Sequence, residues 1–199
     1  MTMQLLRLAR QFLLIFLIGG ISLAASLAAG LADPPVAGSL LMTIPSAQLV
    51  IPPNQQIRHP IALIKPLYPP YTVILTAQVD SPNDPDMQWG IQLCDTLAQL
   101  NCGEAGVLLL LTLDGYFNLY PFAPDTNRFI HLHADLQANE IYINVEGSGH
   151  AVLRLNHEIA WEGQFPTTPY PTLINLVAKG GKSQVSNLHL LSGAVYNAP

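Results

Sequence analysis

From Tyr71 onward, apolar and polar residues alternate in short runs separated by glycine, proline, asparagine and aspartate. A period of two residues places successive side chains on opposite faces of a strand, so these runs predict β-strands with one buried face. The run 105–113 is continuously apolar, which predicts a strand covered on both faces. No amphipathic helix is evident, so we expect an all-β sandwich of two antiparallel sheets. The predicted strands are 71–79, 87–93, 105–113, 116–122, 129–136, 140–146, 151–156, 172–178 and 183–191.

Residues 33–70 differ in composition, because they contain nine prolines. Three short apolar pieces lie between the prolines: SLLMTI, AQLVI and IALIK. Proline cannot donate to a central hydrogen-bond ladder, so these pieces predict edge strands or extended arms after a tether at 33–38. Together with the main part of the sandwich at 71–199 they form a single domain of about 39–196.

Residues 1–32 differ in composition both from the proline-rich segment and from the predicted strands. Arg7 and Arg10 precede an uninterrupted apolar stretch, and the segment ends in the small residues ASLAAGLA. This order predicts a secretory signal peptide, cleaved after Ala28 or Ala32. The alternative is an uncleaved membrane anchor, because residues 12–32 could just span a bilayer. Either interpretation places the rest of the chain outside the cytoplasm, secreted or at the cell envelope, and limits membrane contact to this segment.

Composition narrows the function classes. Charged residues make up only 11% of the chain and hydrophobic residues 50%, which is typical of a packed domain and not of a disordered tail. The net charge is −5, and it becomes about −7 once Arg7 and Arg10 are removed. No cluster of lysine and arginine is present, so a nucleic-acid partner is not expected.

The two cysteines, Cys94 and Cys102, enclose the short segment DTLAQLN between two predicted strands. In an oxidising compartment this spacing predicts a disulfide that stabilises the fold by roughly 2–3 kcal/mol. A metal site is the alternative, but no nearby histidine or cysteine completes a tetrahedral set.

A family resemblance follows from the order of several stretches. WGIQ, GVLLLLTLDGYFNLY, NEIYINVEG, VLRLN and INLVAKGGKSQVSNLHLL resemble the concanavalin A-like (laminin G-like) jelly roll of lectins and glucanases. In that family a strand ending in Gly-Tyr, a strand opening on Asn-Glu, a hairpin around Asn and a Gly-Gly turn recur in this order. The resemblance covers roughly 70–195. It implies two antiparallel sheets, one of which is often concave and used for glycans.

The same resemblance bears on catalysis. Hydrolytic relatives of this fold, such as laminarinases, carry Glu-x-Asp-x-x-Glu on one strand. Here the nearest counterpart begins at Glu140, but Tyr142 replaces the aspartate and Val145 the second glutamate. Glu140 and Glu146 lie about 20 Å apart on a straight strand, whereas glycosidase pairs need ~5–9.5 Å. A hydrolase would therefore have to bring carboxylates together from different strands.

Two short segments after the predicted strand 140–146 are interpreted as connections between strands. The stretch 147–150 predicts a joint between strands, and residues 156–158 predict the next turn. Glu158 and Glu162 are then surface residues near that turn. No nucleophile elbow, phosphate loop or dinucleotide fingerprint is present in the sequence.

Outward positions of the predicted strands are rich in tyrosine, amide and basic side chains. Tyrosine rings present apolar faces to sugar C–H groups, and amides and arginine supply directional hydrogen bonds. This mixture suits a neutral glycan, although a plain polar sheet surface is the alternative. The candidate binding residues are Tyr116, Asn118, Tyr120, His131, His133, Tyr142, Asn144 and Arg154, with Gln88, Gln92 and Asn175 as neighbours.

The sequence leaves two questions open: whether histidines or an acidic loop bind a metal ion, and where the two tryptophans lie. His131 and His133 share a strand face and could bind Zn²⁺ or Cu²⁺ if a neighbouring strand supplied a third ligand. Relatives of this fold often bind calcium near their loops, and no other cofactor is expected. Trp89 is expected in the core, whereas Trp161 either seals the sandwich or lies at a binding rim. The candidate calcium ligands are Asp80, Asn83, Asp84 and Asp86.

These observations favour an exported, non-catalytic β-sandwich that binds a glycan or mediates adhesion at a bacterial envelope. Its partner would be a glycan or an envelope protein. A carbohydrate-active hydrolase and a structural, protein-binding sandwich are the alternatives.

Overall fold

The computed structural model describes residues 38–80, 86–95, 106–130, 132–133, 137–166 and 169–197, together with 11, 12, 16 and 19–21. Of residues 124–126 only the backbone is described. The chain divides into two compact units, Met1–Pro35 and Val36–Pro199. Most of the expected signal segment lies outside the described residues, so its assignment stays a prediction. Within the described part, none of the helices has the length and apolar character needed to span a bilayer.

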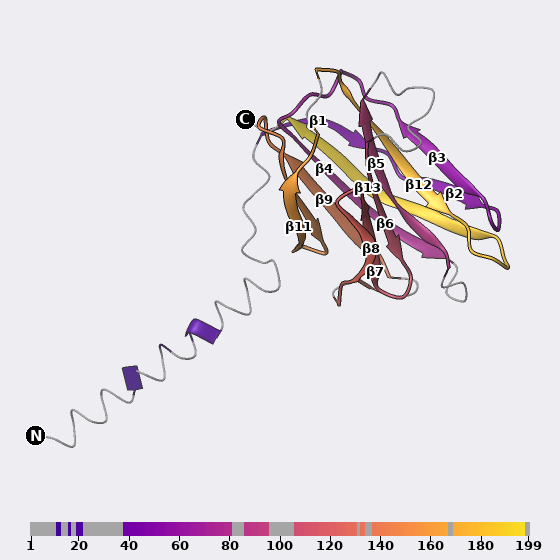
Figure 1. The fold of residues 1–199 in the computed structure, drawn as a ribbon, viewed down its shortest axis with the longest axis horizontal. Coiled ribbons are helices and arrows are strands. Elements are labelled where there is room, and N and C mark those ends of the chain that lie inside the picture. Colours follow the sequence, from indigo (N-terminus) through magenta and orange to yellow (C-terminus); the bar gives the residue numbers. More distant parts are fainter. Residues whose placement is uncertain are drawn as a thin grey trace, which may run out of the picture. The chain divides into compact units, whose positions relative to one another are not determined.

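The second unit is a sandwich of two antiparallel sheets (Figure 1). Sheet A has the order β1-β13-β4-β9-β10-β11, with β2 also paired to β13, and sheet B has the order β3-β12-β5-β6-β7-β8. The predicted all-β, two-sheet sandwich is confirmed. Sheet A contains β1 (Ser39–Ile44), β2 (Ala47–Ile51), β4 (Tyr71–Asp80), β9 (Asn139–Val145), β10 (His150–Leu155), β11 (Glu158–Gln164) and β13 (Ser186–Asn197). Sheet B contains β3 (Gln56–Ile61), β5 (Gln88–Asp95), β6 (Val107–Thr112), β7 (Tyr116–Tyr120), β8 (Ala123–Arg128) and β12 (Thr172–Lys179).

The proline-rich region supplies the first three strands. β1 and β3 are edge strands of sheets A and B, as expected for segments interrupted by proline. The third strand is displaced from the predicted apolar piece 61–65 to Gln56–Ile61. There it pairs with β12, and only its last residue, Ile61, is buried in the core.

The predicted strand 129–136 is not found at its described positions, which are 129, 130, 132 and 133, and the preceding residues form β8 instead. Phe129 leaves the sheet, and its N–H donates to the carbonyl of Gly115 at 2.9 Å. Its ring packs edge to face on Phe117, with centroids 6.1 Å apart, and Leu132 is buried. The apolar residues Phe129 and Leu132 therefore pack on the core from outside the strands.

A strand that the sequence reading missed is β11. Asn156 and His157 form a two-residue turn with positive φ angles of 50° and 74°, and β11 begins at the next residue. Glu158 and Glu162 are therefore strand residues and not turn residues. The apolar signal of β11 is weak because it is the half-exposed edge of sheet A.

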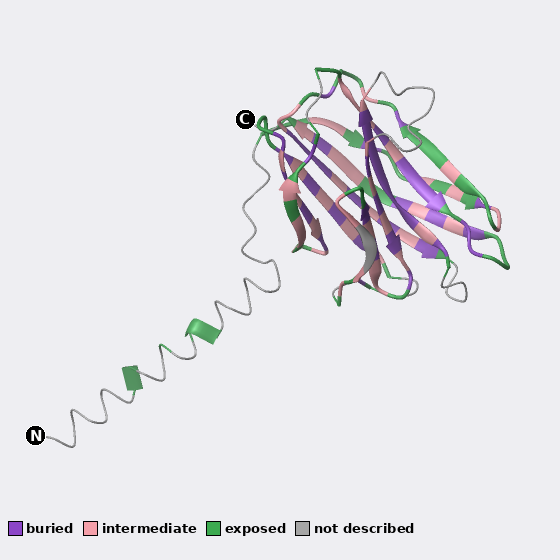
Figure 2. Ribbon diagram, viewed as in Figure 1, coloured by how far each residue is buried: buried purple, intermediate pink, exposed green. Residues whose placement is uncertain are grey.

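The core consists of the inward rows of both sheets, and alternate strand residues are buried in Figure 2. In β6, Val107, Leu109 and Leu111 are buried, whereas Leu108 and Leu110 are only half-buried. The prediction that this strand is fully covered on both faces is therefore wrong. Trp89 is 1% exposed, so its predicted core position is confirmed.

One side of the sandwich is closed by three stacked aromatic rings, which we call the aromatic seam. Trp161 on β11 lies 5.2 Å from Phe122 and 5.3 Å from Phe165, measured between ring centroids. Phe122 follows β7 of sheet B, so the seam joins the two sheets. Gly163 makes room for it, because a Cβ atom there would lie 2.4 Å from the Trp161 ring. Trp161 therefore seals the sandwich.

Replacing Trp161 by alanine is expected to lower the free energy of unfolding by about 2–4 kcal/mol, because the seam loses its largest ring. Urea denaturation followed by circular dichroism measures this change. Tyr68→Ala is the control, since Tyr68 is 48% exposed and its loss should change stability by no more than about 0.5 kcal/mol. Equal, small effects of both substitutions would contradict the role of the seam.

Candidate ligand-binding site

The predicted binding residues lie on two different outer faces. Tyr116, Asn118 and Tyr120 alternate with buried Phe117 and Leu119 on β7, so they point outward from sheet B. Tyr142 and Asn144 on β9 and Arg154 on β10 point outward from sheet A. The inner faces pack against each other, so the two outer faces point away from one another. The set therefore does not form the single face that we expected.

On sheet A the three predicted residues are engaged within the protein. The Asn144 side-chain amide donates to the Thr72 hydroxyl at 2.9 Å. Burial raises the pKa of the Tyr142 phenol, and a hydrogen bond with the same Thr72 side chain lowers it in part. Nη1 of Arg154 donates to the carbonyl of His157 at 3.1 Å. These contacts explain the residues as parts of the sheet surface.

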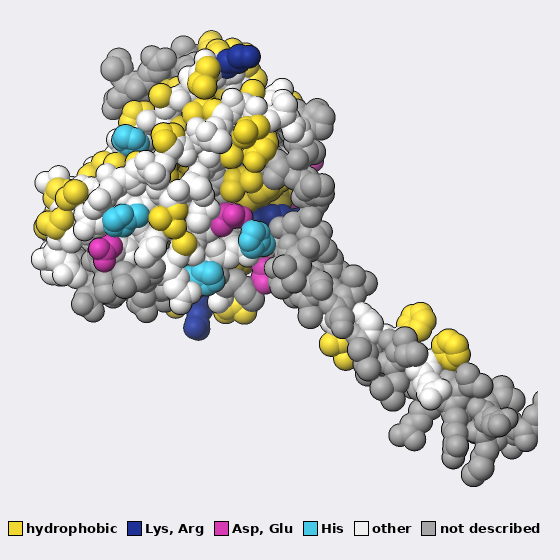
Figure 3. Space-filling view, turned by 180° about the vertical axis from the view of Figure 1, so that it is seen from behind, with side chains coloured by type: hydrophobic (Ala, Val, Ile, Leu, Met, Phe, Trp, Pro, Cys, Tyr) yellow, Lys and Arg dark blue, Asp and Glu magenta, His cyan; other side chains and the backbone are white. Residues whose placement is uncertain are grey.

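Sheet A also brings acidic and histidine side chains together. Figure 3 shows histidines next to acidic side chains on one face of the molecule. His150 Nδ1 lies 3.5 Å from Glu146 Oε1, and Nε2 lies 3.0 Å from Glu162 Oε1. The two glutamates are about 55% exposed. The sequence reading missed this convergence, because it depends on the β10–β11 register that pairs Val152 with Glu162.

His133 is held by its neighbours, and His131 lies outside the described residues. The Asn139 side chain accepts a hydrogen bond from the His133 N–H at 2.7 Å and donates to the His133 carbonyl at 2.9 Å. His133 Nδ1 lies 2.8 Å from the Ala138 carbonyl. Among the residues that the structure describes, no group of three or more histidine, cysteine or acidic side chains could hold a metal ion. The paired-histidine metal site stays a prediction.

Only part of the candidate calcium loop is described. Asp80 ends β4 and is exposed, and Asp86 forms an ion pair with Lys182 at 2.8 Å. Asn83 and Asp84 lie outside the described residues, so the calcium site also stays a prediction.

The predicted disulfide between Cys94 and Cys102 is also only partly within the described residues. Cys94 is buried near the end of β5, and the described part of the chain contains no free cysteine. Cys102 lies outside the described residues, so the pairing remains a prediction.

The outer side of sheet B offers a more open surface over β6 and β7. The register places Leu108 beside Tyr120 and Leu110 beside Asn118. The Thr112 hydroxyl accepts a hydrogen bond from the Tyr116 N–H at 3.0 Å. Thr112 and Tyr116 are therefore neighbours, next to the pair formed by Leu110 and Asn118. We call this surface the β6–β7 face; its residues are Leu108, Leu110, Thr112, Tyr116, Asn118 and Tyr120.

The β6–β7 face is the accessible part of a wider surface. Tyr120 is 45% exposed, whereas Gln92 on β5 is 1% exposed and Val177 on β12 is fully buried. Asn175 donates from Nδ2 to the Cys94 sulfur at 3.6 Å. Gln92 is thus closed to solvent and Asn175 is half-buried, although both were expected beside the ligand.

The six residues of the β6–β7 face are uncharged, and charged side chains adjoin them at one end, where Arg128 of β8 pairs with Tyr116 and the Thr112 hydroxyl donates to Asp114. Neither β6 nor β7 contains an acidic or basic residue. The Asn118 Oδ1 atom is buried and has no hydrogen-bond partner among the described residues. An unpaired amide oxygen of this kind is costly, and rotation of the side chain toward a ligand donor would relieve the cost.

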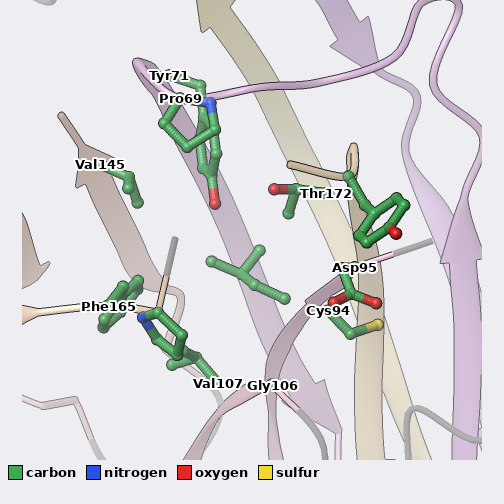
Figure 4. A pocket seen from close by; sticks show the side chains of 12 residues that line it. Pro69, Tyr71, Cys94, Asp95, Gly106, Val107, Val145, Phe165 and Thr172 are labelled. Carbon is green, nitrogen blue, oxygen red and sulfur yellow. The ribbon is translucent and has the colours of Figure 1, made fainter. Parts of the chain in front are cut away.

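A cavity opens between the sheets at one end of the sandwich (Figure 4). Tyr71 at the start of β4 and Thr172 at the start of β12 contribute hydroxyl groups, and Asp95 at the end of β5 contributes a carboxylate. Tyr71 is 3% exposed, and this burial raises the pKa of its phenol to about 12, although the hydrogen bond with Thr172 lowers it in part. We call this the end cavity. It was not predicted, because its residues are far apart in the sequence.

Alkaline pH should destabilise the protein through Tyr71. Its phenol ionises near pH 10.0 in the unfolded chain but near pH 12 in the folded protein. The stabilisation from the protonated phenol is complete below pH 10 and is lost as pH rises to 12, by ~2–3 kcal/mol. Urea denaturation at several pH values should show this loss in the natural protein and a weaker pH dependence in Tyr71→Phe. Identical slopes in the two proteins would contradict the assignment.

Comparison with known proteins identifies the fold. No model of a known protein family matches the chain, and none of the curated proteins does. One similar solved structure comes from work on endo-acting O-glycanases, which prominent members of the human gut microbiota express to initiate mucin breakdown. Its TM-score is 0.57 at 9% identity, and the likeness covers 77% of this chain and 79% of that chain. The Emp46p carbohydrate recognition domain in its metal-free form has a TM-score of 0.56 at 13% identity, over 76% and 83%. A sialidase has a TM-score of 0.55 at 12% identity, over 82% of this chain but only 16% of its own. These likenesses show the fold alone: the chain is a two-sheet antiparallel jelly-roll sandwich, as predicted.

Proposed function

We propose that this chain is an exported, non-catalytic module that binds a neutral glycan on the β6–β7 face. The observation that carries the proposal is the register of β6 and β7. It places two tyrosines, an amide and a hydroxyl beside two leucines, on strands without any charged residue. No comparable neutral surface is offered by the outer side of sheet A around His150.

The physical match is between this surface and a sugar ring. Leu108, Leu110 and the Tyr120 ring present apolar area to the C–H groups of a sugar. The amide of Asn118 and the hydroxyl of Tyr116 can donate to and accept from sugar hydroxyls, whereas the Thr112 hydroxyl is bonded to Asp114 and to the backbone of Tyr116. An uncharged ligand brings no ion that would have to be desolvated on this neutral surface. The names of structures with the same fold, a carbohydrate recognition domain and O-glycanases, agree with a sugar ligand.

Export supports the same role. A signal-like segment at 1–32, a low content of charged residues and a cysteine pair suit a protein of the envelope or the extracellular space. In that compartment the partner is a surface glycan, and adhesion through an envelope protein is the alternative. The proposal needs no metal ion. The Emp46p domain exists in metal-free and potassium-bound forms, and Asp80 and Asp86 remain candidate calcium ligands here.

Sugar hydrolysis is the second candidate, because Glu146 and Glu162 meet at one imidazole ring. A single ring between two carboxylates is compatible with the ~5–9.5 Å that glycosidase pairs span. However, both carboxylates contact His150 on an exposed surface, and neither lines the end cavity. Binding without cleavage is therefore the better supported function.

Tyr120→Ala and Asn118→Ala should each weaken binding of a neutral glycan by roughly 3–10-fold, because each removes one stacking surface or one hydrogen-bonding group. A glycan array with the purified protein identifies the ligand, and calorimetry measures the affinities. Tyr196→Ala is the matched control, because Tyr196 lies on the outer side of sheet A, opposite Thr72. Its affinity should equal that of the natural protein.

Two outcomes would reject this proposal. Failure to bind any glycan on the array would leave the structural, protein-binding role. Release of product from a labelled polysaccharide, abolished in Glu146→Gln or Glu162→Gln, would instead establish the hydrolase.

A further inference from the structure

We infer that the end cavity binds one uncharged sugar unit at the end of a glycan chain. The inference rests on the proposed function and adds a second contact region to it, because none of the cavity residues belongs to the β6–β7 face. Its parts come from both sheets and from the segment after β11. The lining residues are Pro69, Tyr71, Leu93, Cys94, Asp95, Gly106, Val107, Val145, Phe165, Pro166, Tyr170 and Thr172.

The polar groups of the cavity are matched to hydroxyl groups. Figure 4 shows the Tyr71 and Thr172 oxygens directed into the space between the sheets. Each of these hydroxyls can donate one hydrogen bond and accept others, so their mutual bond leaves one donor and several acceptor positions for a ligand. The Asp95 carboxylate accepts from up to four donors and is suited to two adjacent sugar hydroxyls.

The remaining walls are rings and aliphatic groups. Pro69, Phe165 and Pro166 give apolar surface, and Tyr170, 40% exposed, adds an aromatic ring. A pyranose has C–H groups on its faces and hydroxyls around its edge. Ring walls beside a few convergent polar groups complement this distribution.

Charge decides between neutral and acidic sugars. No lysine, arginine or histidine is among the described residues that line the cavity, and Asp95 is the one carboxylate there. A uronic acid, a sialic acid or a phosphate would place a second anion beside Asp95, and the described lining offers that anion no cationic side chain. The cavity therefore discriminates against anionic ligands.

The size of the cavity limits the ligand to one unit. Its volume is about 160 Å³. One bound water needs ~10–15 Å³ on the same measure, so the cavity holds roughly as many atoms as a single pyranose with its hydroxyls. A chain passing through the site would need openings on two sides, whereas here the sheets close the inner side. The cavity is thus suited to a chain end.

The end cavity and the β6–β7 face include neighbouring residues at the start of β6. Val107 lines the cavity, and the next residue, Leu108, belongs to the β6–β7 face. Because successive strand side chains point to opposite faces, Val107 lies on the inner side of sheet B and Leu108 on its outer side. The cavity and the face are therefore separate contact regions, and binding of a sugar unit in the cavity does not depend on the face.

The test is calorimetric titration of the full protein with free D-glucose, D-galactose, D-mannose and N-acetyl-D-glucosamine, and with D-glucuronic and D-galacturonic acid. At least one neutral sugar should bind, and the acids should not. Asp95→Asn should weaken that binding roughly tenfold or more, because it removes a charged hydrogen-bond acceptor without changing shape. Tyr170→Ala is a second variant that removes a ring from an exposed position. It should weaken binding too, whereas Tyr120→Ala should not.

The results separate this inference from the proposed function. Equal binding of neutral and acidic sugars, or unchanged affinity in both Asp95→Asn and Tyr170→Ala, would overturn the inference. If no free sugar binds but longer neutral glycans bind in a Tyr120-dependent manner, the end-cavity inference is wrong and the proposed function stands. If no glycan of any length binds, both are wrong.

Discussion

Mutual burial of the two inner sheet faces is the constraint on which every other feature of this protein depends. Leu75 and Ile141 of sheet A and Leu109 and Leu176 of sheet B have no exposed surface. Each such side chain contributes roughly 1.5–3 kcal/mol when it leaves water. Because strand side chains alternate, fixing this inner set also fixes which polar residues face outward. The two resulting surfaces differ: sheet A carries glutamate and histidine around His150, whereas the strands β6 and β7 of sheet B are uncharged.

Local patterns predicted most strands but not their partners. β4 and β9 follow directly from alternation, because each buries one face along its length. The edge strands β8 and β11 escaped detection, because a half-exposed edge has little apolar periodicity. Tyr116 and Tyr142 have the same local pattern, yet they belong to different sheets, and only long-range pairing decides this. The end cavity was invisible for the same reason, since Tyr71, Asp95 and Thr172 meet only after both sheets have formed.

Two buried side-chain amides of this sandwich differ in how far the fold satisfies them. Asn139 is buried and exchanges two hydrogen bonds with the backbone of His133, and its oxygen also accepts from Asn156 at 2.8 Å. This network ties the loop before β9 to the turn between β10 and β11, and it gives the Asn-Glu opening of β9 a structural reason. Asn118 contrasts with it, because its buried oxygen has no partner within the described residues. The bonds of Asn139 stabilise the sandwich, and the Asn118 oxygen lies where a ligand is proposed.

The pairing of the first and last strands has a mechanical consequence. Ser39 at the start of β1 lies opposite Asn197 at the end of β13, so both ends of the sandwich leave from the same place. Tension between these ends would load the Ser39–Asn197 pair first and open the β1–β13 ladder one hydrogen bond after another. Ladders opened in this way resist little force, because their bonds do not share the load. The domain is therefore poorly suited to transmit tension between its first and last strands.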